Sequence, residues 1–263
     1  MKVYKAFAKV NIFLKITGSR GDYHEIVSRF MVVKDLYDEL SFVLKEEVDA
    51  RENVFKIIGD FSCLTEQNTI YKAYLALKKA TSSQALETLT QTHALKVKKN
   101  IPAFAGLGGG SSDAATYLKM CNERLDLGLS LSELAQIGLI VGADVPFFIY
   151  GYDSANVSGI GEVVEEFHEE LLDIETYTPK VEISTPRVYK TYREKFYNPI
   201  DAFETQRLKE MKSIDALKEM NPFQANDLFE SALQGYKELK QHHRSGFHFS
   251  GSGSSFFRVK SST

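Results

Sequence analysis

The sequence predicts an α+β fold with two lobes. Three observations lead to this prediction: 263 residues suffice for one large or two small domains, helical and strand-like segments are interleaved without strict alternation, and a small, polar stretch at 151–161 divides the chain. We place the domain boundary in that stretch. Residues 1–155 then form the N-terminal domain and residues 156–263 the C-terminal domain.

The first predicted element is a strand over residues 6–16, where apolar side chains occupy every second position. A period of two residues over eleven positions is typical of a β-strand. It places Lys9 and Asn11 on the same face, about 7 Å apart along the strand. A turn follows at 18–22, and the apolar runs 30–33 and 40–44 are predicted to be two further strands.

Helices dominate the next part of the chain. Apolar residues at helical spacing predict a helix over residues 68–80, and residues 95–97 are predicted to form a short strand. A glycine-rich stretch comes next, followed by a second helix. The apolar face of this second helix consists of Ala114, Leu118, Cys121 and Leu125.

The remaining predicted elements are again a mixture of helices and strands. Ser130 and Glu133 form a capping box, which predicts a helix that runs to about Gly138. Residues 145–150 and 181–184 are predicted to be strands. Several helices are expected between residues 202 and 240, and the apolar run 256–259 follows a turn rich in glycine and serine.

Composition excludes several classes of protein. The net charge is −3, from 32 basic and 35 acidic residues without a basic block, so a nucleic-acid partner held by charge is not expected. Two cysteines, Cys63 and Cys121, exclude a disulfide scaffold and a multi-cysteine zinc site. The first residues lack the apolar core of a secretory signal, and no run is long and apolar enough for a spanning helix, so we expect no membrane and a cytoplasmic location.

The most informative segment is the glycine-rich stretch at 102–112. Glycines allow backbone N–H groups to converge on a ligand, and the start of the following helix adds free N–H groups and a positive dipole end. This arrangement suits a polyphosphate, and Ser111 and Ser112 add hydroxyl groups for phosphate oxygens or a metal ion. The segment consists of Pro102, Ala103, Phe104, Ala105, Gly106, Leu107, Gly108, Gly109, Gly110, Ser111 and Ser112.

Familiar phosphate-binding motifs do not account for this stretch. A Walker G-K-[ST] sequence is absent, Ser111 stands where the dinucleotide fingerprint needs its last glycine, and the H-R-D and D-F-G signatures of protein kinases are absent. From composition alone, a glycine-rich surface loop with serine caps remains an alternative.

Three motifs in the same order resemble those of the GHMP small-molecule kinases. They are the strand segment at 8–14 (AKVNIFL), the glycine-rich stretch at 102–115, and the turn at 249–255 (FSGSGSS). The resemblance covers nearly the whole chain and implies a two-domain GHMP kinase fold with the active site in the cleft between the lobes. Within this superfamily, residues 23–25 (YHE) and 142–148 (GADVPFF) most resemble the kinases of 4-diphosphocytidyl-2-C-methyl-D-erythritol.

The resemblance implies a catalytic pair. Asp144 would accept the proton of the substrate hydroxyl, while Lys9 would orient and polarise that hydroxyl. From the residues alone, non-catalytic alternatives remain: Lys9 as a solvated lysine on a strand, and Asp144 as an aspartate in a turn or helix cap.

The resemblance also implies ATP as the phosphoryl donor and Mg²⁺ bound with the nucleotide. ATP would be bound by the stretch from Pro102 to Ser112, with Asn68 and Lys99 near the nucleoside. The alternatives are a helix N-cap for Asn68 and a solvated charge for Lys99.

The implied acceptor is a small molecule, cytidine diphosphate methylerythritol, phosphorylated at its C2 hydroxyl in the non-mevalonate route to isopentenyl diphosphate. The acceptor would be bound by Asn11, Tyr23, His24, Thr185 and Tyr189, with the cytosine between aromatic rings and His24 reading its edge. The family usually has D-G-Y-H where this chain has Gly-Asp-Tyr-His at 21–24. Either order makes a turn, so we expect Tyr23 and His24 to keep their places.

Other functions stay open on the sequence alone. A kinase of the same superfamily for homoserine, mevalonate or a sugar has no clear use for Tyr23, His24 and Tyr189. A non-catalytic nucleotide sensor on the same fold has no need of both Lys9 and Asp144. A dinucleotide-dependent oxidoreductase lacks its fingerprint.

Overall fold

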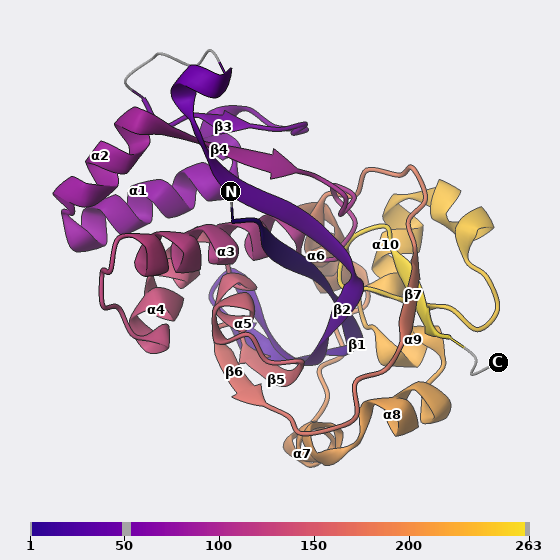
Figure 1. Ribbon diagram of the computed structural model, residues 1–263. Coiled ribbons are helices and arrows are strands. Elements are labelled where there is room, and N and C mark those ends of the chain that lie inside the picture. Colours follow the sequence, from indigo (N-terminus) through magenta and orange to yellow (C-terminus); the bar gives the residue numbers. More distant parts are fainter. Residues whose placement is uncertain (1, 49–53, 261–263) are drawn as a thin grey trace. The chain divides into compact units, whose positions relative to one another are not determined.

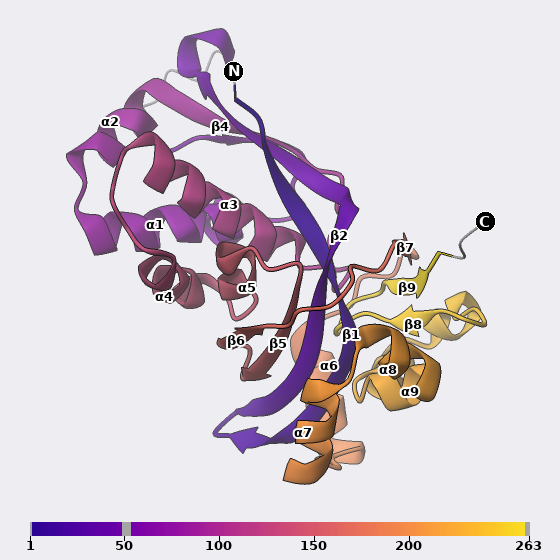
Figure 2. The same cartoon turned by 60° about the horizontal axis from the view of Figure 1, so that its bottom comes forward.

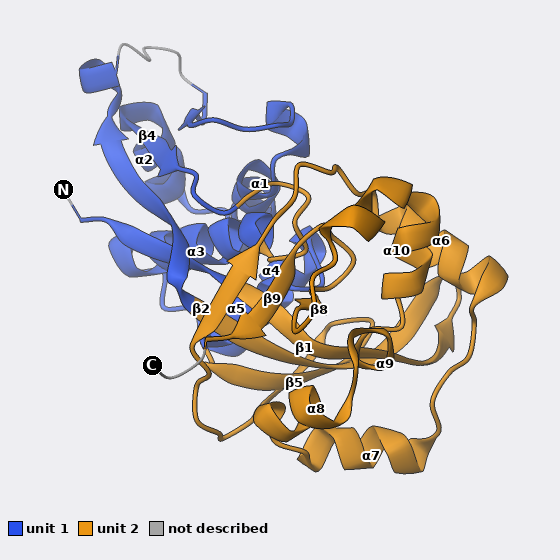
Figure 3. Cartoon of the chain, turned by 90° about the vertical axis from the view of Figure 1, so that its right-hand side faces the viewer, with its two compact units in different colours: residues 1–8, 34–101, 109–151 blue, residues 9–33, 102–108, 152–263 orange. Residues whose placement is uncertain are grey.

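A computed structural model describes residues 2–48 and 54–260. Helices and strands are mixed along the chain, which confirms the predicted α+β class. The chain forms two compact units, each assembled from separate segments (Figure 3). Unit 1 comprises residues 1–8, 34–101 and 109–151, and unit 2 comprises residues 9–33, 102–108 and 152–263. The predicted domain boundary at 155/156 remains a proposal.

Two long strands begin the chain (Figure 1). Strand β1 (Tyr4–Arg20) contains the predicted alternating segment and pairs with β2 (Tyr23–Leu44) across a turn in which Gly21 has φ +60°. The two strands predicted at 30–33 and 40–44 are parts of one long strand in the structure, β2. This strand pairs with different neighbours along its length. Its first half pairs with β5 (Ser154–Gly159), and its second half pairs with β4 (His93–Lys98).

Unit 1 places helices beside strands β2, β3 (Ile57–Ile58) and β4. Helix α1 (Thr69–Thr81) starts after Asn68, and α2 (Gln84–Thr92) leads into β4. Helix α3 (Gly109–Arg124) packs on α1, and α4 (Leu131–Val141) begins with the predicted capping box of Ser130 and Glu133. Short 3-10 turns lie at Lys45–Val48 and Thr65–Gln67.

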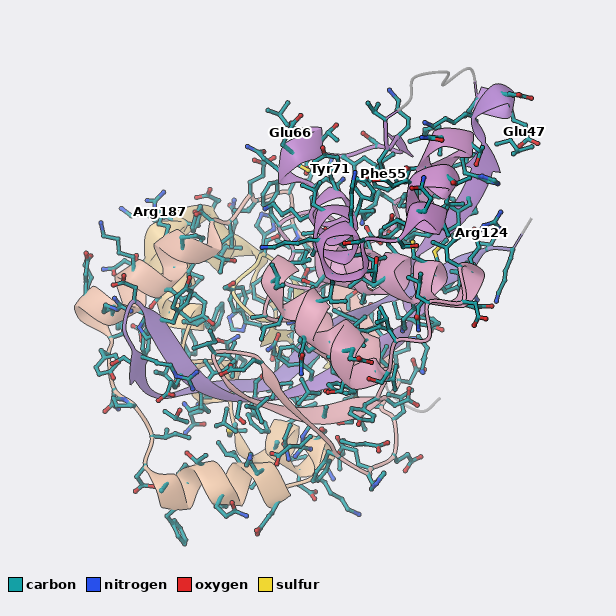
Figure 4. All side chains as sticks on the ribbon, turned by 90° about the vertical axis from the view of Figure 1, so that its left-hand side faces the viewer. Glu47, Phe55, Glu66, Tyr71, Arg124 and Arg187 are labelled. Atoms are coloured by element: carbon teal, nitrogen blue, oxygen red, sulfur yellow. The ribbon has the colours of Figure 1, made fainter. Side chains whose placement is uncertain are left out.

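Aromatic rings fill the space beside α1. The rings of Phe55 and Tyr71 stack with their centroids 6.4 Å apart, and Figure 4 labels both side chains. Phe55 also contacts Tyr117 of α3, with a centroid distance of 5.3 Å. This cluster helps to hold the two helices together.

The strand predicted at 145–150 is wrong, because these residues form helix α5 (Val145–Tyr150). Pro146 near the start suits a first helical turn, and Gly151 ends the helix in the left-handed conformation with φ +73°. All residues from 145 to 149 are buried, where α5 packs on α3 and α4. A helix buried on every side has no periodic pattern, so its apolar run resembles that of a buried strand.

Unit 2 contains β5, β6 (Val163–Glu166) and a three-stranded sheet in the order β7-β9-β8 (Figure 2). These strands are β7 (Ile174–Tyr177), β8 (His248–Phe249) and β9 (Phe256–Val259), the last of which is the apolar run noted in the sequence. The predicted strand at 181–184 is wrong. Its apolar residues Val181 and Ile183 pack into the core of unit 2 from irregular backbone, in which the Val181 N–H bonds to the Pro179 carbonyl.

Several helices lie between residues 202 and 240, as expected. They are α7 (Ala202–Glu210), α8 (Ser213–Glu219), α9 (Pro222–Ala225), α10 (Phe229–Gly235) and the 3-10 turn Lys237–His242. Helix α6 (Thr185–Lys195) precedes this range and was not predicted. Helix α10 packs on α6 over a core that includes Leu228, Phe229 and Phe256. Across the described residues, none of the helices has the length and apolar character that crossing a membrane requires.

Candidate active site

Lys9 and Asn11 share one face of β1, as their spacing predicts. The Lys9 side chain is buried, its Nζ donates to Asn11 Oδ1 at 2.6 Å and lies 4.1 Å from the centre of the Phe30 ring. Asn11 in turn donates from Nδ2 to Ser28 Oγ on β2 at 2.9 Å. The alternative of a solvated Lys9 is therefore wrong, because only 3% of the residue is exposed.

The first part of the glycine-rich stretch, residues 102–108, belongs to unit 2 and is called here the loop segment. Gly106 and Gly108 have φ +76° and φ +72°, a region that side chains other than glycine rarely adopt. Pro102, Ala103 and Phe104 are exposed, while Ala105 and Leu107 are buried. The Leu107 carbonyl accepts the backbone N–H of Lys9 at 2.9 Å, so this segment is tied directly to β1.

The turn at 250–255, called here the closing turn, packs on the loop segment. The N–H groups of Ser254 and Ser255 donate to the carbonyls of Phe104 and Ala105 at 3.2 and 3.0 Å. A Cβ on Gly253 would lie 2.0 Å from the Gly106 nitrogen, so the two backbones touch. The closing turn is therefore a packed element.

Asn226, which the sequence analysis missed, holds the closing turn from the other side. Its Nδ2 donates to the carbonyls of Phe249 and Gly251 at 3.1 and 2.9 Å, and its Oδ1 accepts the Leu228 N–H. The residue is 2% exposed, so water is a poor substitute for these partners. A single asparagine between helices has no spacing pattern that could have identified it.

The second part of the glycine-rich stretch starts helix α3 in unit 1. Gly109, Gly110, Ser111 and Ser112 form its first turn, where backbone N–H groups lack partners within a helix. This turn contains no acidic residue. It therefore suits an anion, and the Gly110 carbonyl is held by Thr69 Oγ1 at 2.6 Å.

Asn68 and Lys99, predicted to lie near the nucleoside, have clear structural partners. Asn68 caps α1, because its side chain accepts the Ile70 N–H at 2.9 Å. Lys99 makes ion pairs with Asp38 and Asp113, and its side chain is only 19% exposed, which contradicts the alternative of a solvated charge. Contact of either residue with ATP stays a prediction.

Asp144 stands at the N-cap position of α5 and is half-buried, and its side chain makes no capping hydrogen bond. The segment before it lies beside the start of α3, since a Cβ on Gly142 would be 3.8 Å from Ser111 Oγ. Lys119 of α3 donates to the Phe148 carbonyl at 2.8 Å and so ties α5 to the same helix. Unit 1 thus brings the predicted base next to the predicted phosphate-binding turn.

His24 lies among tyrosine rings in unit 2. Its ring centre is 5.3 Å from that of Tyr189, 5.7 Å from Tyr192 and 6.1 Å from Tyr197. Burial, together with the charge of Arg193, lowers the pKa of His24 below 6.5, which favours the neutral ring at pH 7. Its buried Nε2 has no hydrogen-bond partner in the described part of the chain.

Two further predicted acceptor residues of unit 2 are Tyr23 and Thr185. Tyr23, the neighbour of His24 on β2, is 65% exposed. Thr185 is the first residue of α6, and its Oγ1 lies 2.7 Å from Ser252 Oγ in the closing turn. The structure therefore brings Tyr189 to His24 and Thr185 to the closing turn, and the binding of an acceptor by these residues stays a prediction.

The chain is similar to known kinases over its whole length. The family model of the GHMP kinases N terminal domain matches residues 68–152. A 4-diphosphocytidyl-2-C-methyl-D-erythritol kinase of Sulfurimonas denitrificans is 69% identical over 263 residues, 99% of this chain and 97% of that protein. One of Helicobacter pylori is 40% identical over 273 residues, 99% of this chain and 95% of that protein.

Solved structures agree with these relatives. A 4-(cytidine 5'-diphospho)-2C-methyl-D-erythritol kinase superposes with a TM-score of 0.70 at 27% identity, covering 98% of this chain and 90% of the other. The mevalonate kinase of Methanococcus jannaschii, with a TM-score of 0.62 at 13% identity and coverage of 99% and 90%, shares the fold. The chain therefore belongs to the family of 4-diphosphocytidyl-2-C-methyl-D-erythritol kinases, within the GHMP kinases.

Proposed function

We propose that this kinase transfers the γ-phosphoryl group of ATP to the C2 hydroxyl of 4-diphosphocytidyl-2-C-methyl-D-erythritol. The products are the 2-phosphate and ADP, in the methylerythritol phosphate route to isopentenyl diphosphate. The observation that carries this proposal is the 69% identity to a kinase of that name over 99% of the chain. We also propose that the reaction takes place in the cytoplasm.

In the proposed mechanism, Asp144 takes the proton of the C2 hydroxyl as its oxygen bonds to the γ-phosphorus. The bond from that phosphorus to the β-phosphate bridging oxygen breaks, and ADP leaves. Lys9 directs the hydroxyl, and its position is fixed by the 2.6 Å bond to Asn11. Phosphoryl transfer depends mainly on positioning and charge stabilisation, so two such groups and an anion-binding turn are adequate.

The nucleotide site is proposed at the stretch from Pro102 to Ser112. Support comes from the acid-free first turn of α3 and from the glycine conformations of the loop segment. Mg²⁺ would neutralise phosphate charge in the transition state. Within residues 2–48 and 54–260, no group of three or more histidine, cysteine or acidic side chains is gathered for a metal, so we propose that the phosphates and the hydroxyl groups of Ser111 and Ser112 hold the ion.

For the acceptor, we propose that cytosine lies against Tyr189 and that His24 reads its edge. A neutral imidazole with a free buried Nε2 supports this role, since it can donate or accept one hydrogen bond. We further propose contacts from Asn11, Tyr23 and Thr185.

The test is ADP release by the purified protein with ATP, magnesium and the cytidine substrate, run beside homoserine, mevalonate and galactose. Turnover with the cytidine substrate alone is expected. Turnover with another acceptor alone would leave a GHMP kinase without the cytidine site, and nucleotide binding without any turnover would favour the sensor.

The catalytic pair is tested by Asp144→Asn. The amide has the shape of the carboxylate but does not accept the proton, so turnover should fall by about 10²-fold or more while nucleotide still binds. Turnover close to that of the parent enzyme would exclude Asp144 as the base.

A further inference from the structure

Three charged side chains of unit 1, two of which are buried, lie next to the two ends of the predicted phosphate-binding stretch. Lys99 Nζ lies 2.5 Å from Asp113 Oδ2 and also pairs with Asp38. Asp38 and Asp113 are 0% and 2% exposed. Buried carboxylates require partners, so the two aspartates and the partly exposed Lys99 form one interdependent cluster.

This cluster binds the chain on both sides of the glycine-rich stretch. Asp38 Oδ1 accepts the backbone N–H groups of Asn100 and Ile101 at 2.5 and 2.8 Å, and these residues directly precede Pro102. Asp113 is the fifth residue of α3, four positions after Gly109. Lys99 therefore connects the entry of the stretch, through Asp38, to its exit, through Asp113.

The two ends also touch. A Cβ on Gly109 would lie 2.9 Å from Ile101 Cγ2, so the first residue of α3 rests on the last residue before Pro102. Asn100 adds a bond from Nδ2 to the Tyr37 carbonyl at 2.7 Å. A small shift of either end would move the backbone N–H groups at the start of α3.

We propose that Asp38, Lys99 and Asp113 act as a clamp that positions the two ends of the glycine-rich stretch, and that Lys99 influences nucleotide binding through this clamp. This inference rests on the proposed function only for the assignment of the stretch to the phosphates of ATP. It replaces the expected contact of Lys99 with the nucleoside. Lys99 is then a positioning residue.

The charges support this assignment. Two of the three N–H donors of the Lys99 ammonium point to carboxylates, and the cluster as a whole has one negative charge more than positive when all three groups are ionised. A group with net negative charge does not attract a polyphosphate. Its effect on the nucleotide comes instead from the backbone it holds.

The experiment compares ATP with inorganic tripolyphosphate, which has the phosphates but no nucleoside. Dissociation constants are measured by calorimetry for the full-length protein and for Lys99→Met, Asp38→Asn and Asp113→Asn. Lys98→Met is the matched control, because Lys98 is exposed and pairs with Glu39 at the surface. The clamp predicts that Lys99→Met weakens ATP and tripolyphosphate by the same factor, about tenfold or more, while Lys98→Met changes neither.

A Lys99→Met variant that weakens ATP but leaves tripolyphosphate unchanged would overturn the clamp, because it would place Lys99 against the nucleoside. If Lys99→Met does not fold, Asp38→Asn decides, since Asp38 is completely buried and can act only through its neighbours. Equal weakening of both ligands in Asp38→Asn supports the clamp, and unchanged binding of both overturns it. Asp113→Asn is expected to have a smaller effect in the same direction, because Lys99 keeps Asp38.

This outcome is separate from that of the proposed function. Tripolyphosphate binding needs no acceptor, so the clamp can fail while the cytidine substrate is still phosphorylated. Conversely, the clamp can hold in a protein that turns over a different acceptor.

Discussion

The loop segment and the start of α3 are consecutive in the chain, but different forces hold them. The loop segment is fixed by backbone contacts with the closing turn, in which Gly253 rests directly on Gly106. The start of α3 is fixed by the charged clamp and by Thr69. Close backbone packing tolerates no added atom but is indifferent to pH, whereas a buried ion cluster depends on the charge of its members and responds to protonation.

The largest expected effect is that of Gly253→Ala. The new Cβ would lie 2.0 Å from the Gly106 nitrogen and 2.1 Å from the Ala105 carbonyl carbon, so the backbone must move. We expect a loss of about 3 kcal/mol or more in the free energy of unfolding, measured by urea denaturation, together with weaker nucleotide binding.

Gly128→Ala is the control for this variant. Gly128 has φ +68° but nothing within 4 Å of a Cβ, so only backbone strain of about 1 kcal/mol is expected. Equal destabilisation by the two alanines would show that the contact between the closing turn and the loop segment is less important than its geometry indicates.

The next effect is that of Asn226→Ala, which removes the donor for two buried carbonyls of unit 2. We expect a loss of about 2 kcal/mol in the free energy of unfolding. Asn100→Ala is the counterpart beside the clamp. Asn100 is exposed, so water can replace its bond to Tyr37 and the loss should stay below about 1 kcal/mol. A larger loss with Asn100→Ala than with Asn226→Ala would contradict the assignment of Asn226 as a main support of the closing turn.

The pH dependence of stability distinguishes the two ways of holding the stretch. Burial raises the pKa of Asp113 from 3.8 to about 7, against the lowering effect of Lys99 and with a further rise from Asp38. Between pH 3.8 and about 7, Asp113 therefore keeps its proton in the folded protein but has released it in the unfolded chain. As pH rises through this window, Asp113 makes the free energy of unfolding fall.

Asp113→Asn should remove this decline. The free energy of unfolding is measured for parent and variant by urea denaturation from pH 4 to pH 8. As pH rises, the value for the parent should fall steadily relative to that for the variant. A difference that is constant over this range would show that Asp113 is ionised in the folded protein throughout.

The smallest effect is that of Thr69→Val, which removes the 2.6 Å bond to the Gly110 carbonyl. Gly110 is exposed, so water can replace the lost hydroxyl at its carbonyl, and the expected loss is about 1 kcal/mol or less. Thr69→Ser keeps the hydroxyl and should retain the nucleotide affinity of the parent. A large loss of stability with Thr69→Val would show that this hydroxyl holds the start of α3 more strongly than the clamp does.

The sequence predicted the fold best where a regular period or a motif was present. The alternation in β1 placed Lys9 and Asn11 on one face, and Ser130 with Glu133 located the start of α4. The helix α5 was mistaken for a strand because it is buried on all sides. The continuity of β2 was missed because residues 34–39 are largely polar, although the backbone continues without interruption from one partner strand to the other.

The candidate site was predicted through its motifs, and the residues that support those motifs were missed. Asp38 and Asn226 are single polar residues whose partners are distant in sequence, and such contacts leave no local pattern. Lys99 was identified, but its carboxylate partners were not. The tyrosines around His24 were found only in part, since Tyr192 and Tyr197 lie outside any recognised motif.

Each unit contains segments from distant parts of the chain, and this limits how the protein can be expressed as two fragments. Unit 2 takes residues 9–33 and 102–108 from the first half of the chain, and these supply most of β1, part of β2 and the segment on which the closing turn rests. A fragment that begins at residue 152 would lack all of them and should remain unfolded. Co-expressing the two fragments 1–151 and 152–263 should restore folding only when they associate, which makes Gly151 a natural cut point for a split-enzyme reporter.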